Sequence, residues 1–176
     1  MKHAPRWAAV IGAVTLAACR SGTEPTTTNP APSFDRDGGG RVIQSATGAG
    51  HFTVAGELRT FAFTAHRHAD GSVTGQYQLI SRATDAKIHG EVTCLSVVGN
   101  RAWIGGVQKN GSEGFPEGLE NGFRVVDNGE GANDPPDQLS LMFVNAAPGF
   151  AQAYCNARPA APPVFPIEGG NIQVRD

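Results

Sequence analysis

The sequence predicts an all-β domain, a small antiparallel meander barrel of about eight strands, with a β-sandwich as the alternative. Three observations favour this fold class. Segments in which apolar and polar residues alternate recur from Arg41 to the end of the chain, with glycine-containing turns between them. Glycine accounts for 23 of the 176 residues, and charged residues make up only 17 %. We expect no helix beyond the first 18 residues, so the domain, residues 41–176, is built from strands.

The longest alternating segment, residues 58–82, predicts a β-hairpin around the turn Ala69-Asp70-Gly71. A two-residue Asp-Gly turn would place Gln78 among the apolar side chains. A three-residue loop with Gly71 in the left-handed conformation keeps both apolar sets on one face. That register pairs Phe63 with Tyr77, Phe61 with Leu79, and Ala65 with Gly75.

The other predicted strands follow the same alternation. They are residues 41–45, 51–55, 87–98, 101–109, 122–126, 138–145 and 171–175. Gly48 and Gly50 separate the first two, and Gly99-Asn100 suits a tight turn between 87–98 and 101–109. That turn predicts three pairs: Leu95 with Ile104, Val97 with Ala102, and Val92 with Val107. Both faces of this hairpin carry apolar residues, so we expect it to be covered on both sides.

Residues 1–18 have the pattern of a secretory signal peptide, with Lys2 and Arg6 ahead of an apolar run too short to span a bilayer. The run ends in Leu16-Ala17-Ala18-Cys19, which resembles the bacterial lipobox. That resemblance implies that Cys19 is lipidated and anchors the protein to the cell envelope. Arg20 favours the outer membrane if the host has one. The alternative is an ordinary signal peptide cut at an Ala-x-Ala site. Residues 19–40 then form a flexible tether rich in Thr, Pro and Gly.

Within the domain, three segments carry a resemblance: TCLSVVGNRAWIGG, FRVVDNGEG and ANDPPDQLSLMF, which lie between residues 93 and 143. They resemble a group of uncharacterised secreted bacterial domains that are small β-barrels, similar to the allene-oxide-cyclase kind. The likeness covers residues 58–144. It implies a barrel fold, and it transfers no activity and no catalytic residue to this chain.

With Cys19 assigned to lipid, Cys94 and Cys155 remain in a domain expected to be exported. An oxidising compartment favours a disulfide between them, and two unpaired thiols are the alternative. The bridge would attach the segment after Ala146, which has little pattern of its own, to the central sheet.

Two groups of residues suggest metal sites. His66 and His68 point the same way on a strand and could share a zinc ion. The hairpin register puts both on the face away from the core, so we expect a solvated surface there and no metal. The loop Asp127–Asp137 is rich in oxygen ligands that calcium prefers, but the same residue types form tight turns. Whether it binds calcium is left open.

The function expected from these features is a lipid-anchored envelope β-barrel that acts as a binding or structural module. A net charge of -2 without a basic cluster gives no reason to expect nucleic acid. No cofactor motif is present. The candidate ligand-binding residues are Phe61, Phe63 and Tyr77, which could surround a small apolar ligand or fill the barrel themselves. An isomerase or cyclase using the barrel mouth is the alternative, and it would require ionisable residues such as Glu91 inside a cavity.

Overall fold

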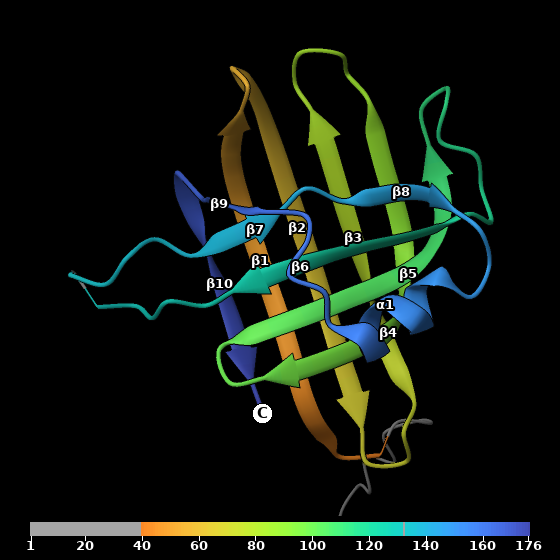
Figure 1. Ribbon diagram of the computed structural model, residues 1–176, viewed down its shortest axis with the longest axis vertical. Coiled ribbons are helices and arrows are strands. Elements are labelled where there is room, and N and C mark those ends of the chain that lie inside the picture. The colour runs from red at the N-terminus through yellow and green to blue at the C-terminus, as the bar shows by residue number, and fades with distance from the viewer. Residues whose placement is uncertain (1–39, 132) are drawn as a thin grey trace, which may run out of the picture. The chain divides into compact units, whose positions relative to one another are not determined.

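A computed structural model describes residues 40–131 and 133–176, which form an all-β domain with one barrel-like antiparallel sheet (Figure 1). The strand order is β10-β1-β2-β3-β4-β5-β6-β7-β9, and β8 pairs with β6. The strands are β1 Val42–Val54, β2 Glu57–His68, β3 Val73–Ser81, β4 Lys87–Val98, β5 Arg101–Gly111, β6 Glu120–Val126, β7 Gln138–Ser140, β8 Phe143–Ala146, β9 Val164–Pro166 and β10 Gly169–Arg175. One helix, α1 Phe150–Ala157, lies against β4 and β5.

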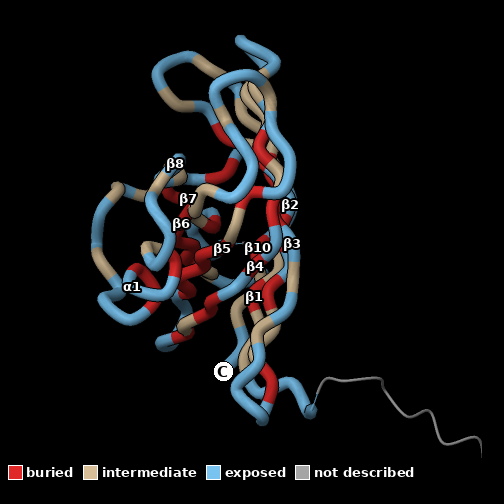
Figure 2. The backbone as a smooth tube through the Cα atoms, turned by 90° about the vertical axis from the view of Figure 1, so that its right-hand side faces the viewer, coloured by how far each residue is buried: buried red, intermediate tan, exposed pale blue. Residues whose placement is uncertain are grey.

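The sheet curls so that β5, β6 and β7 cross in front of β1, β2 and β3, and the core lies between the two halves (Figures 1 and 2). Glycines and bulges permit this curl. At Gly106 of β5, a Cβ atom would lie 2.0 Å from the Glu91 carbonyl oxygen of β4. The register also shifts between Val92 and Cys94. The two strands therefore approach closely and bend at the same level.

The register predicted for the β2–β3 hairpin is confirmed. Phe63 pairs with Tyr77, Phe61 with Leu79, and Ala65 with Gly75. Gly71 has φ +87° at the turn, which is the left-handed conformation that the three-residue loop requires. All the apolar side chains of these pairs are buried in the core.

The β4–β5 register agrees with the prediction near the turn and departs from it further along. Leu95 pairs with Ile104 and Val97 with Ala102, as expected. Val92 pairs with Gly106, not with Val107. The reason is the bulge at Thr93, which adds one residue to β4 and shifts the pairs of Val92, Glu91 and Gly90 by one. A second irregularity, between His89 and Gly90, restores the expected register for the last two pairs.

Four predicted element boundaries are wrong. The two predicted strands 41–45 and 51–55 are parts of one continuous strand, β1 Val42–Val54, because Gly48 and Gly50 make room for close neighbours and do not form a turn. A Cβ at Gly48 would lie 2.8 Å from the Phe63 ring, and one at Gly50 would lie 2.2 Å from the Gly169 carbonyl oxygen. Residues 138–145 form two short strands, β7 and β8. The proline-rich run 159–166 contains β9, and the segment after Ala146 contains α1, although no helix is expected from the sequence beyond residue 18.

The predicted disulfide is present and holds α1 against the outer face of the sheet. Cys94 of β4 and Cys155 of α1 are bonded, with a Cα–Cα distance of 6.2 Å. The Glu120 carboxylate accepts a hydrogen bond of 2.6 Å from the Ala151 N–H in the first turn of the helix. Trp103 donates from Nε1 to the Pro159 carbonyl at 2.9 Å. The β4–β5 hairpin is thus covered on both faces, as its apolar residues predict.

The loop Asp127–Asp137 attaches to β10 through its carboxylates. Asp137 accepts hydrogen bonds from the Ile172 and Asn128 N–H groups, each at 2.8 Å. Asp127 accepts from the Val174 N–H at 2.8 Å. These side chains satisfy donors of β10 that no strand pairs with, because β10 lies at the edge of the sheet. The oxygens considered for calcium are therefore used as acceptors for backbone N–H groups.

Glu130 extends the same contact at the surface. Its carboxylate accepts hydrogen bonds from the side-chain amides of Gln173 and Asn171. These two contacts lower the pKa of Glu130 from its usual value. The loop and β10 are thus joined by three acidic residues.

Candidate functional site

The interior aromatic cluster is closely packed. Phe61, Phe63 and Tyr77 are all less than 10 % exposed. The Phe63 ring lies 5.5 Å from the Phe123 ring, and the Tyr77 ring lies 6.0 Å from it, both edge to face. The space left beside these rings is about 10 Å³, which is no more than one water molecule needs. At this level the sheet is filled by its own side chains.

Buried polar groups inside the sheet are hydrogen-bonded to one another. Asn121 donates from Nδ2 to the Tyr77 hydroxyl at 3.0 Å and to Gln108 Oε1 at 3.1 Å. Gln108 donates in turn to the Pro116 carbonyl at 2.9 Å. Burial raises the pKa of Tyr77 to about 12, so its hydroxyl stays protonated at neutral pH. This cluster stabilises the fold and offers no group for acid–base chemistry near pH 7.

Glu91 lies on the outer surface of the sheet. The isomerase or cyclase hypothesis would require this ionisable residue inside a cavity. The Glu91 side chain is 57 % exposed and forms an ion pair of 3.2 Å with Lys109 on the outer surface. The interior therefore lacks the acid or base that the isomerase alternative predicts at this position.

A pocket of about 220 Å³ opens at one end of the interior, and we call it the mouth pocket. The β1–β2, β3–β4 and β5–β6 connections gather at this end, which is the upper end in Figure 1. Its apolar lining is Leu79, Ala86, Ile88, Phe115, Met142 and Val144. Its polar lining is Glu57, Arg59, Ser81 and Thr84.

The two charges of the mouth pocket come from the start of β2. Glu57 and Arg59 continue the inward-facing alternation of Phe61 and Phe63, which places both side chains at the end of the interior. Arg59 Nη2 donates to Glu57 Oε2 at 3.0 Å, and the side chains are 25 % and 40 % exposed. Arg59 Nε is buried and has no hydrogen-bond partner among the described residues. The pair is therefore partly desolvated and incompletely satisfied.

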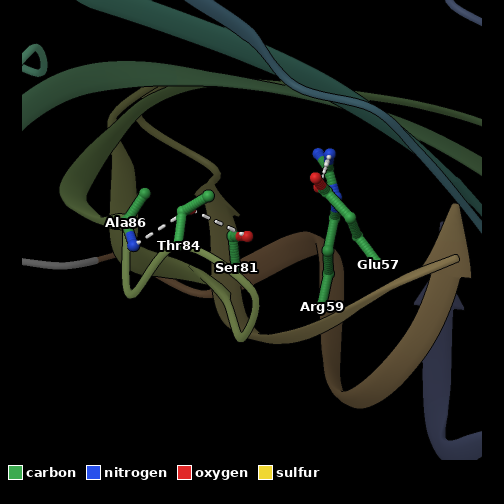
Figure 3. A network of polar contacts seen from close by, with 5 residues as sticks. All are labelled: Glu57, Arg59, Ser81, Thr84 and Ala86. Carbon is green, nitrogen blue, oxygen red and sulfur yellow. Dashed lines mark hydrogen bonds and ion pairs between the residues drawn. The ribbon is translucent and has the colours of Figure 1, made fainter. Parts of the chain in front are cut away.

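Two hydroxyl side chains, Ser81 and Thr84, also line the mouth pocket, and Figure 3 shows them to one side of the Glu57–Arg59 pair. Thr84 Oγ1 donates to Ser81 Oγ at 3.1 Å and lies 3.4 Å from the Ala86 N–H. These residues belong to the end of β3 and to the β3–β4 turn. The mouth pocket thus combines an apolar floor with a charged pair and two hydroxyl groups.

Sequence analysis missed the mouth pocket. A signal was present for Glu57 and Arg59, because extending the confirmed hairpin register by two more alternate positions puts both side chains inside. No comparable signal exists for Phe115, Met142 and Val144. They lie in a loop or in short strands, and their approach to the pocket depends on the path of the chain in space.

A second hollow lies on the outer face of β1–β4, over the small residues Ala49 and Ala62. Gln78 and His89 are among the polar residues beside it. This hollow has a volume of about 320 Å³ and is shallow and open. It encloses a ligand less well than the mouth pocket does.

The two histidines of the hairpin differ in their surroundings. His66 pairs with Thr74, as the register predicts, and is half-buried. The expectation of a solvated surface is wrong for His68, which is 9 % exposed. Its Nδ1 donates to the Gly40 carbonyl at 2.7 Å, and its Nε2 lies 2.9 Å from the Thr74 hydroxyl. The chain entering β1 covers this residue.

In the part of the chain that the structure describes, no three His, Cys, Asp or Glu side chains gather closely enough to hold a metal ion. Nor does any helix among residues 40–131 and 133–176 have the length and apolarity to cross a membrane. The predicted signal peptide and Cys19 lie outside the described residues, as does the tether up to residue 39.

No family model, curated protein or solved structure matches the chain. The resemblance to uncharacterised secreted β-barrel domains stays a prediction.

Proposed function

We propose that the protein is a lipid-anchored envelope module that binds a small, largely apolar ligand in the mouth pocket. The observation that carries the proposal is the pocket itself, because six apolar residues line it beside an incompletely satisfied charged pair. Pockets with an apolar lining and a few convergent polar groups are the usual form of small-molecule sites. A volume of about 220 Å³ is below the usual range of about 300–1,000 Å³ for ligand pockets, so the ligand is small.

The first described residues and the mouth pocket lie at opposite ends of β2. The Arg41 carbonyl, at the start of the domain, accepts a hydrogen bond of 2.9 Å from the Ala69 N–H beside the β2–β3 turn. Arg59 lies near the other end of β2, nine residues before His68. At a rise of about 3.3 Å per residue, roughly 30 Å of strand separates the two. The chain therefore enters the domain far from the pocket.

The binding test is an NMR titration of the soluble chain, residues 20–176, with 1-hexanol. This chain retains all the described residues, 40–131 and 133–176, which belong to one compact unit. Export to the periplasm would allow the Cys94–Cys155 bond to form. We expect saturable shifts of the backbone amide signals at Arg59, Thr84 and Phe115. Shifts confined to the outer face, or none up to the solubility limit of hexanol, would refute the proposal.

A matched pair of variants separates pocket binding from surface binding. Ala86→Trp places a large ring in the mouth pocket, whereas Ala62→Trp places the same ring in the outer hollow. Hexanol binding should be lost in the first variant and retained in the second. The reverse pattern would assign the ligand to the outer face.

The anchor has its own test, which does not depend on the ligand. The full chain should incorporate a fatty-acid probe in growing bacteria, and the Cys19→Ala variant should not. Unlabelled wild-type protein would exclude lipidation at Cys19.

A further inference from the structure

We infer that the ligand of the mouth pocket carries an uncharged head group that both donates and accepts hydrogen bonds, such as a primary amide. This inference rests on the proposed function, since it specifies the chemistry of the same site. The head group would lie beside the Glu57–Arg59 pair, with the apolar part directed towards Met142 and Phe115.

The first step is the charge of the site. Among the residues that line the mouth pocket, Glu57 and Arg59 carry the charges, and they neutralise each other across 3.0 Å. An ammonium head would be repelled by Arg59 and a carboxylate head by Glu57. Either would have to break the existing ion pair or leave one charge unpaired in a partly desolvated site. An uncharged head avoids both costs.

The second step is the unused hydrogen-bonding capacity of the pair. A guanidinium group has five N–H donors, and among the described residues Arg59 donates only to Glu57. Glu57 uses one carboxylate oxygen for that contact and has a second acceptor oxygen. The pair therefore offers donors and an acceptor side by side. A primary amide has the complementary set, a carbonyl oxygen and an NH₂ group.

The third step is the pair of hydroxyl side chains that also line the mouth pocket. Ser81 and Thr84 present hydroxyl groups, which act as donors or acceptors and carry no charge. They suit a polar uncharged ligand and give no reason to prefer either sign of charge. All polar groups of the mouth pocket are thus compatible with the same class of head group.

The experiment compares three ligands that share one apolar chain: hexanamide, hexanoate and hexylamine. Each is titrated at pH 7 into the soluble chain, residues 20–176, and followed by amide chemical shifts. We expect the Kd of hexanamide to be lower than that of either charged ligand by about tenfold, which corresponds to one hydrogen bond to a charged group. Equal affinity for all three heads would overturn the inference and leave the proposed function intact. Absence of binding by every six-carbon ligand, hexanol included, would overturn the proposed function itself.

Two reciprocal variants sharpen the test. Glu57→Gln leaves Arg59 unpaired, so hexanoate should bind about tenfold more tightly and become the preferred ligand. Arg59→Gln leaves Glu57 unpaired and should shift the preference to hexylamine. Glu91→Gln is the matched control, because it removes a glutamate from a surface ion pair with Lys109 outside the pocket, and it should change no ranking.

The amide spectra of the variants also report whether each is folded. If one variant does not fold, its reciprocal partner still tests the inference. A folded variant that keeps the wild-type ranking would contradict the inference, and so would a wild type that binds hexanoate best.

Discussion

Asp137 is expected to be the most important single side chain for closing the edge of the sheet. Its carboxylate is 5 % exposed and accepts from the N–H groups of Ile172 and Asn128. Ile172 is fully buried in β10, so its N–H would have no partner if the carboxylate were removed. Asp137→Ala therefore removes two hydrogen bonds to a charged group and leaves a buried donor unsatisfied.

The expected cost follows from these contacts. Hydrogen bonds to charged groups contribute about 1.5–3 kcal/mol each, so the loss of two in Asp137→Ala should lower the free energy of unfolding by about 3–6 kcal/mol. Asp134→Ala is the matched control within the same loop. The Asp134 carboxylate is exposed and accepts from the Gly131 N–H at 2.7 Å, so its loss should cost no more than about 1 kcal/mol.

Urea unfolding of the soluble chain, residues 20–176, measures both values. Trp103 is 6 % exposed, and it is the one tryptophan in that chain, so its fluorescence reports the transition. The dependence of the free energy of unfolding on urea concentration should be the same in both variants and the wild type. This would show that the substitutions change the stability and not the compactness of the unfolded state. Asp137→Ala and Asp134→Ala variants of equal stability would refute the role assigned to this carboxylate.

Three further predictions concern the core, the hairpin histidines and the anchor. Phe63→Ala should cost about 3–5 kcal/mol in urea unfolding, since it deletes a packed core ring; a cost below 1 kcal/mol would mean that the ring is not in the core. His68→Ser should cost about 1–2 kcal/mol because it removes two buried contacts, whereas His66→Ser should change stability by no more than about 0.5 kcal/mol. Equal effects of the two histidine substitutions would contradict the difference in burial. Cys19→Ala should move the full chain out of the membrane fraction or leave it unprocessed. A variant that is processed and stays in the membrane fraction as the wild type does would argue against a lipid anchor.

The parts of the fold that local alternation and turn chemistry specify could be predicted from the sequence. Phe61, Phe63 and Ala65 alternate up to a loop in which Gly71 supplies a positive φ, and the register of that hairpin is correct. The bulge at Thr93 could not be predicted. Both faces of the β4–β5 hairpin carry apolar residues, so either register buries apolar groups.

Glycine caused one of the errors in the predicted boundaries. Gly48 and Gly50 have the residue type of a turn, but in the folded protein they make space for the Phe63 ring and for β10. Such close approaches depend on strands far apart in sequence. The short helix α1 did have a local signal, since Ala151, Tyr154 and Cys155 are buried at the helical spacing of three and four.

The mouth pocket is formed partly by residues whose direction follows from the local register and partly by residues placed by the path of the chain in space. The inward direction of Arg59 follows from the same register that places Phe61 and Phe63. The pocket floor, by contrast, is completed by Phe115 and Met142, and a loop path of this kind has no pattern in the sequence.

The most direct test of the mouth pocket as the functional site is a crystal structure of the soluble chain, residues 20–176, soaked with hexanamide. We predict electron density for the amide beside Glu57 and Arg59, with its carbon chain over Met142. Density over Ala49 and Ala62 on the outer face, or a mouth pocket closed by the side chains that line it, would contradict the assignment.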